Sequence, residues 1–258
     1  MPRLRVNGVA IHHEVRGSGP AILGIHGSLS SAALWAKAAA TLATRGRAIT
    51  YDRRGCNRSE RPRPYATDVA QQAGDAAALI EALGAAPAIL IGRSYGADIA
   101  MDLALRRPDL VRALALLEGG EALFAPGRRW LAQVEAEVLA AGPGGAAEAL
   151  MGIVLGDAGW DDLPDAVRAV MAGNGEALIA EFRGGYLRAA PEDLAAIGRP
   201  VLLVAAADSP APFAEATALL AAAMPSARVA RVAGGHMIDP AHPAILAFID
   251  EVLAPRPA

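Results

Sequence analysis

Gly92-Arg93-Ser94-Tyr95-Gly96 has the G-x-S-x-G spacing that can present a serine as a nucleophile. Residues 88–91, just before it, form a short apolar stretch typical of a buried strand, and a run of good helix formers follows it up to Pro108. In such a strand–turn–helix the serine side chain stands clear of the sheet, and free N–H groups at the helix start can stabilise negative charge. We therefore predict that Ser94 is a nucleophile, against the alternative of an incidental serine in a glycine-rich turn.

A serine nucleophile needs a general base, and our candidate is His236. It follows Gly234-Gly235, directly after the last predicted strand, at residues 228–232, and before the last predicted helix. Loops at the carboxyl ends of parallel strands are where sites form. The alternative base is His26, which directly follows another predicted strand, although the adjacent Gly27 favours a role in backbone geometry.

Composition limits the class of protein. The chain has 258 residues, of which 53% are hydrophobic and 20% charged, and this allows one large α/β domain with a sizeable core. A net charge of −3 provides no basic stripe, so we expect no nucleic-acid partner. Lys37 is the only lysine, which disfavours Schiff-base chemistry, and Cys56 is the only cysteine, which excludes an intrachain disulfide.

The sequence also predicts no metal site, no cofactor and no membrane partner. Neither H-E-x-x-H nor C-x-x-C is present, and the first five residues lack the apolar core of a signal peptide. No apolar run reaches the ~18 residues of a membrane span. We therefore expect a cytoplasmic protein.

The predicted strands and helices alternate along most of the chain. Asn7-Gly8 between two β-rich runs is a hairpin signal. Strands are predicted at residues 21–25, 47–51, 88–91, 111–117, 201–207 and 228–232. Helices are predicted at residues 32–43, 69–83, 97–106, 214–223 and 245–252. This order predicts an α/β fold, with a mostly parallel twisted sheet covered by helices on both faces.

Residues 119–198 interrupt that alternation. They carry helical patterns separated by glycine and proline clusters, at residues 130–139, 146–155 and 177–187. We interpret this segment as a helical cap inserted into a core formed by residues 1–118 and 199–258. Such an insertion would lie over the strand ends and cover the site.

The order and spacing of four segments resemble the α/β-hydrolase family over nearly the whole chain. These are His26-Gly27, Asp52-Arg53-Arg54-Gly55, the Gly92–Gly96 turn and Gly235-His236. The resemblance implies that the backbone N–H groups of Ser28 and Tyr95 form an oxyanion hole. It further implies that Ser94 attacks a carbonyl group to form an acyl-enzyme, which is hydrolysed by water that His236 activates.

Two carboxylates compete for the third position of the triad. In the family the acid usually stands about nine residues after the proline that precedes this strand. Here that proline is Pro200, and the ninth residue after it is Ser209. Asp208 is therefore one residue before the usual position of the acid. Some members, including certain dehalogenases, place the acid at the end of the preceding strand, where this chain has Glu118. Sequences of that kind can carry Ser-Pro at the usual position, as Ser209-Pro210 does here. We favour Glu118 and keep Asp208 as the alternative.

The residue before the nucleophile, Arg93, departs from the usual family pattern. It could pair with Asp52, Asp98 or Glu118, or contact an acidic substrate, and we favour a structural ion pair. Trp35 is a candidate for an apolar substrate pocket. We expect the partner to be a small molecule, an ester with an apolar acyl group, and we leave a homodimer open.

Three functions fit the resemblance. The first is a serine hydrolase acting on a carboxylic ester, lactone or thioester. The second is another enzyme on the same scaffold: a perhydrolase, a hydroxynitrile lyase or a natural-product cyclase or isomerase. The third is a non-catalytic small-molecule receptor, because fold alone does not decide function. Dehalogenase and epoxide hydrolase relatives carry aspartate where this chain has Ser94, which disfavours both of those chemistries.

Overall fold

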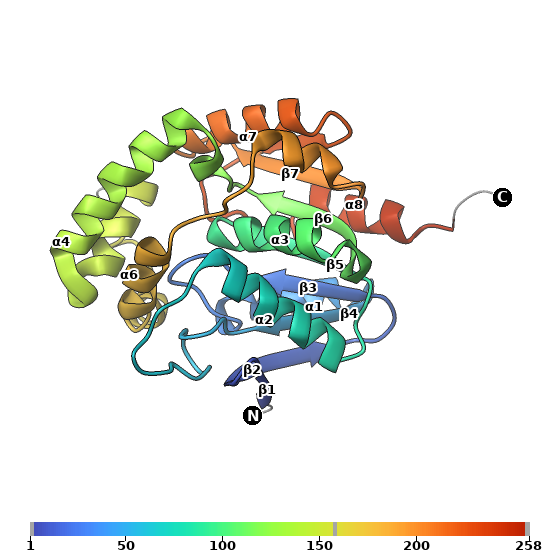
Figure 1. Cartoon of the computed structure of the whole chain (residues 1–258), viewed down its shortest axis with the longest axis horizontal. Helices are drawn as coiled ribbons and strands as arrows, with labels where there is room; N and C mark the ends of the chain where they lie inside the picture. Colours follow the sequence, from blue (N-terminus) through green and yellow to red (C-terminus); the bar gives the residue numbers. More distant parts are fainter. Residues whose placement is uncertain (1–2, 157–158, 256–258) are drawn as a thin grey trace.

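Eight strands form one sheet in the order β1-β2-β4-β3-β5-β6-β7-β8, in a computed structural model that describes residues 3–156 and 159–255 (Figure 1). The strands are β1 (Arg3–Val6), β2 (Val9–Arg16), β3 (Ala21–Ile25), β4 (Arg47–Tyr51), β5 (Ala88–Arg93), β6 (Val111–Leu117), β7 (Val201–Ala206) and β8 (Arg228–Val232). β1 and β2 pair antiparallel at one edge, β2 pairs antiparallel with β4, and the remaining pairs are parallel. The predicted fold class is confirmed.

The hairpin at the sheet edge follows from its two turn residues. Asn7 has a φ of 45° and Gly8 a φ of 81°, so both have the left-handed backbone that a two-residue hairpin of this kind needs. Glycine and asparagine tolerate this conformation better than other residues do. The turn fixes the register that pairs Val6 with Val9.

Helices cover both faces of the sheet. The helices of this core are η1 (Ala33–Trp35), α1 (Ala36–Leu42), α2 (Val69–Ala82), α3 (Tyr95–Arg106), η2 (Pro108–Leu110), α7 (Ala211–Ala223) and α8 (Pro243–Leu253). α1 and α8 contribute to the apolar cluster on one face, and α2, α3 and α7 contribute to the cluster on the other.

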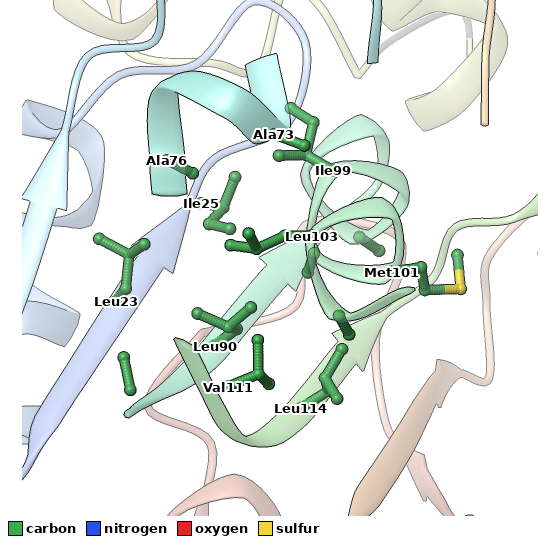
Figure 2. Close-up of a cluster of buried hydrophobic side chains, with 14 of the residues drawn as sticks. Leu23, Ile25, Ala73, Ala76, Leu90, Ile99, Met101, Leu103, Val111 and Leu114 are labelled. Carbon is green, nitrogen blue, oxygen red and sulfur yellow. The ribbon is translucent and has the colours of Figure 1, made fainter. Parts of the chain in front are cut away.

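Alternate residues of each central strand enter opposite clusters, because successive side chains of a strand point to opposite faces. Leu23 and Leu90 pack toward α2 and α3, together with Ile99 and Leu103 (Figure 2). Ile22 and Ile89 instead belong to the cluster under α1 and α8. The strands therefore read as nearly continuous apolar runs, which is why they were predictable.

The chain between β6 and β7 contains helices and no strand in its described residues. The elements are η3 (Glu121–Leu123), α4 (Ala125–Leu155), α5 (Asp165–Ala172), α6 (Gly175–Gly184) and η4 (Pro191–Ala196). α4, α5 and α6 share an apolar cluster of their own, and α4 and α6 lie beside the ends of the central strands (Figure 1). The sequence patterns missed α5, which has only eight residues and is flanked by Pro164 and Gly173.

α4 corrects the expectation about apolar segments. It has 31 residues and a mean hydropathy of 1.6 over its most apolar window, enough by length and composition to cross a membrane. A single helix of this kind is weak evidence for a membrane-spanning segment. α4 is also bent, because Gly142 has a φ of 65° and is followed by Pro143. The bend divides α4 into two shorter helices, since proline cannot continue the hydrogen-bond ladder and glycine tolerates the left-handed backbone.

We expect Gly92→Ala to destabilise the fold. A Cβ atom at Gly92 would lie 2.4 Å from the carbonyl oxygen of Gly96, so β5 and α3 would have to separate. The free energy of unfolding should fall by about 2 kcal/mol or more, measured by urea denaturation. Gly152→Ala is the matched control, because a Cβ atom there meets nothing within 4 Å in a helix, and alanine should stabilise by up to ~1 kcal/mol. Equal stability of the two variants would contradict this account of the close approach.

Candidate active site

Ser94 stands at a strained turn between β5 and α3. Its φ of 54° and ψ of −128° lie outside the regions that non-glycine residues favour. Its backbone is held on both sides, because its N–H donates to the carbonyl of Leu117 (2.9 Å) and its carbonyl accepts from the N–H of Ala97 (2.7 Å). The side chain is partly exposed at the start of α3 and lines a pocket that His236 also lines.

His236 is paired with a carboxylate from the end of β6. Its Nδ1 lies 2.7 Å from Oε2 of Glu118, and both side chains are buried. The Glu118 carboxylate also accepts from the backbone N–H of Ala206 and the hydroxyl of Ser209, each at 2.8 Å. Asp208 has an exposed side chain, and among the described residues only its backbone is engaged nearby, by its N–H donating to the carbonyl of Gly234. Of the two candidate acids, Glu118 is the one in contact with His236.

The contact with Glu118 fixes the tautomer of His236. A carboxylate can only accept, so Nδ1 carries the proton and Nε2 is left as the basic nitrogen. Burial lowers the pKa of His236, with Arg93 acting in the same direction, while the hydrogen bond and charge of Glu118 oppose the shift. The ring stacks on Phe213 of α7, with 4.0 Å between centroids, which limits its rotation. No hydrogen bond joins Ser94 Oγ to His236 within residues 3–156 and 159–255, and such contacts often tighten only with substrate bound.

The loop after β3 lies against the turn that carries Ser94. A Cβ atom at Gly27 would lie 2.8 Å from the carbonyl oxygen of Arg93 and 3.1 Å from Ser94 Cβ, so only glycine allows this approach. Ser28 follows in this loop, and Tyr95 is the first residue of α3, where the N–H has no partner within the helix. Both residues line the pocket with Ser94.

His26 serves the loop and is not placed as a base. Its Nδ1 donates to the carbonyl of Gly27 (2.8 Å), and its Nε2 accepts from the N–H of Arg53 (3.1 Å). Both nitrogens are therefore engaged in the neutral form. Complete burial holds its pKa well below the usual range, as does the charge of Arg53.

A buried ion pair, which the sequence did not reveal, joins this loop to α6. Arg53 Nη2 lies 2.7 Å from Oε1 of Glu181, and Ser28 Oγ donates to the other carboxylate oxygen at 2.6 Å. Arg53 also donates to the carbonyl groups of His26 and Gly27. Burial opposes the charged form of Arg53, but Glu181 outweighs it and raises the pKa of the guanidinium. One carboxylate of the helical segment thus holds the loop in place.

Arg93 and Trp35 are placed differently from the predictions. In the described chain Arg93 forms no ion pair; its guanidinium donates to the carbonyl of Ile238 (3.2 Å) and lies over the ring of Trp35, 5.7 Å from the centroid. Burial lowers the pKa of Arg93 to about 10, against the charge of Asp239. Trp35 does not line the pocket, since it is buried in the cluster under α1 and α8, on Gly24. Arg93 itself does line the pocket.

The pocket beside Ser94 is largely apolar, and the segment between β6 and β7 supplies half of its lining residues and most of the apolar ones. The apolar and aromatic residues from that segment are Trp130, Leu131, Val134, Leu150, Met151, Val154, Met171, Phe182 and Tyr186. Two carboxyl groups also line it, those of Asp98 and Glu121. Burial raises the pKa of Asp98 to about 7, although the N–H groups of Gly120 and Leu187 oppose the shift.

In the parts of the chain that the structure describes, no three His, Cys, Asp or Glu side chains are grouped so that they could hold a metal ion. The pocket lining itself includes a serine hydroxyl, an imidazole and two carboxyl groups, those of Ser94, His236, Asp98 and Glu121.

Comparison with known proteins agrees with this geometry. A sequence model of the alpha/beta hydrolase fold family matches residues 20–142, which include β3, β5, β6 and the turn at Ser94. A thermophilic esterase from Thermogutta terrifontis superposes over 98% of this chain and 100% of its own, with a TM-score of 0.80 and 22% sequence identity. The chain has the α/β-hydrolase fold, and residues 20–142 are similar in sequence to that family.

Proteins of similar sequence match this chain to different extents. A protein of Azorhizobium caulinodans named "Putative carbamate hydrolase RutD" is 29% identical over 248 residues, which cover 91% of each chain. The "Uncharacterized hydrolase YraK" of Bacillus subtilis is 38% identical over 127 residues, which are 46% of this chain and 47% of that protein. The chain thus matches about half the length of YraK. The named relatives support a hydrolase in general.

The pH dependence of the reaction distinguishes Glu118 from Asp208. His236 must be neutral to accept a proton, so kcat/KM should rise with pH and level off, with a midpoint below the ordinary histidine pKa of about 6.5. In Glu118→Gln the plateau should fall by about 10³-fold or more, because an amide neither orients the ring nor stabilises its cation. The midpoint should also move to lower pH, since Glu118 is what raises the pKa of His236.

Asp208→Asn is the matched control for this pH profile. Its side chain is exposed, so the plateau and the midpoint should both match the wild type. A profile that is damaged in Asp208→Asn and intact in Glu118→Gln would reverse the assignment.

Proposed function

We propose that this chain is a serine hydrolase that cleaves a carboxylic ester, lactone or thioester through an acyl-enzyme on Ser94. The observation that carries the proposal is the contact of 2.7 Å between His236 Nδ1 and Glu118, in a pocket that Ser94 also lines. That contact leaves Nε2 of a neutral imidazole available inside an apolar pocket. The strained backbone of Ser94 adds to it, since strain of this kind clusters at active sites.

The proposed reaction has two halves. Ser94 Oγ attacks the carbonyl carbon while Nε2 of His236 takes the hydroxyl proton, and the new oxyanion accepts hydrogen bonds from the N–H groups of Ser28 and Tyr95. The intermediate then expels the alcohol or thiol, which takes the proton from His236. In the second half His236 removes a proton from water, which attacks the acyl carbonyl carbon. The bond from the acyl carbon to Ser94 Oγ then breaks, His236 returns the proton to Oγ, and the carboxylic acid is released.

The proposal also assigns a role to residues 119–198, as a cap over a core of residues 1–118 and 199–258. The support is that α4, α5 and α6 pack together in one apolar cluster and supply most of the apolar residues of the pocket wall. A wall of this kind excludes water from the acyl-enzyme and selects the apolar part of a substrate.

A series of p-nitrophenyl esters of increasing acyl length tests the proposal, with a thioester, a lactone and a carbamate in the same panel. The carbamate is included because of the name of the Azorhizobium relative. Ser94→Ala should lose about 10⁴-fold or more in turnover on the best substrate, because only binding and oxyanion effects remain. Ser226→Ala, at an exposed position, is the control and should retain full activity.

Fluorophosphonate labelling separates the remaining outcomes. Labelling that is lost in Ser94→Ala, without turnover of any ester in the panel, would favour another reaction on the same residues. If Ser94→Ala retained turnover near that of the wild type, Ser94 would not be the nucleophile. Neither labelling nor turnover in the wild type would favour a binding protein.

A further inference from the structure

One wall of the pocket carries polar groups that hydrolysis at Ser94 does not use. Glu121 and Asp98 both line it, together with Tyr186. Glu121 begins η3, three residues after Glu118, and Tyr186 follows α6. Asp98 accepts a hydrogen bond from the N–H of Gly120, the residue directly before Glu121, so the chain brings these two carboxyl-bearing residues to the same region of the pocket.

Glu121 carries a buried carboxylate oxygen without a partner in the described part of the chain. It is 7% exposed, and its Oε1 is buried with no hydrogen-bond partner among the described residues. Burial holds its pKa well above the usual range, and the charge of Asp98 adds to the shift. Asp98, in contrast, accepts from the N–H of Gly120 at 2.8 Å. A buried acceptor without a donor is costly to the fold, and such groups call for a specific explanation.

The protein supplies no cation for Glu121. Within the described chain no arginine or lysine pairs with Glu121 or Asp98. The two buried arginines nearest the site are engaged elsewhere: Arg53 pairs with Glu181, and Arg93 donates to Ile238 and lies over Trp35. The hydroxyl of Tyr186 is also unpartnered in the described chain. Two residues that line the pocket therefore each carry a buried polar atom without a partner in the described chain, the Glu121 acceptor and the Tyr186 hydroxyl.

We propose that Glu121 determines substrate specificity by accepting a hydrogen bond from a hydroxyl or ammonium group on one arm of the substrate. The inference rests on the proposed hydrolase function and names its substrate class: an ester whose otherwise apolar arm carries a hydrogen-bond donor. The remaining wall, from Trp130, Leu131 and Phe182, contacts the apolar part of that arm. A donor that reaches Oε1 satisfies the buried acceptor, whereas a methyl group in its place leaves it unpaired, so the site discriminates between the two.

Three matched p-nitrophenyl esters test this, with acyl chains of equal length that end in methyl, hydroxyl or ammonium. The wild type should prefer the hydroxyl ester over the methyl ester by about tenfold in kcat/KM, and the ammonium ester by up to about a hundredfold. The ratio between the two donor esters decides which donor the site takes. In Glu121→Leu both preferences over methyl should disappear. Glu148→Leu, at an exposed position on α4, should keep the wild-type ratios.

A thermal unfolding curve for each variant shows whether its kcat/KM ratios come from folded protein. Glu121→Gln keeps an acceptor oxygen and should therefore retain part of the preference for the hydroxyl ester. Calorimetric titration with the matching non-hydrolysed amides of the three chains measures the same preference as binding, without turnover. Hydrolysis of the methyl ester with no donor preference in the wild type would overturn this inference and leave the proposed function intact. The absence of turnover of all three esters would count against the proposed function, and the titration would then decide on Glu121.

Discussion

One buried contact, from His236 Nδ1 to Oε2 of Glu118, orders the rest of the site. The carboxylate is fully engaged, with Ala206 and Ser209 as its other donors, so its position is set by β7 and the loop after it. Glu118 itself has a φ of 46°, a conformation that costs free energy in a non-glycine residue and persists only where the surroundings enforce it. Strands β6, β7 and β8 thus converge on one imidazole, and the proposed chemistry depends on that convergence.

The buried pair of Arg53 and Glu181 connects the pocket wall to the sheet. Glu181 belongs to α6, yet it holds the Ser28 hydroxyl and the arginine that braces the carbonyl groups of the same loop. Removing one partner of such a pair typically costs about 3–5 kcal/mol, because the other charge is left uncompensated. A displacement of α6 would therefore also disturb the loop that carries the proposed oxyanion donor. In this arrangement the shape of the pocket and the order of the oxyanion loop are linked.

The sequence predicted those parts of the molecule that local patterns determine. The apolar runs predicted the central strands, Asn7-Gly8 predicted the hairpin, and the spacing around Ser94 predicted the turn before α3. The choice between Glu118 and Asp208 stayed open because it depends on how two strand ends meet, which no local pattern encodes. Arg53 and Glu181 lie 128 residues apart, in segments with no shared motif, so their pairing was invisible. We predicted that Arg93 pairs with a carboxylate, but its guanidinium instead lies over the Trp35 ring and donates to the carbonyl of Ile238.

The acyl-enzyme is the central claim, and trapping it is the most direct test. A slowly hydrolysed p-nitrophenyl ester is mixed with the protein, quenched in acid during turnover, and followed by intact-mass and peptide mass spectrometry. The account predicts a mass increase equal to the acyl group, on the peptide that contains Ser94, and no increase in Ser94→Ala. Product formation without a covalent adduct, or an adduct on another residue, would contradict it.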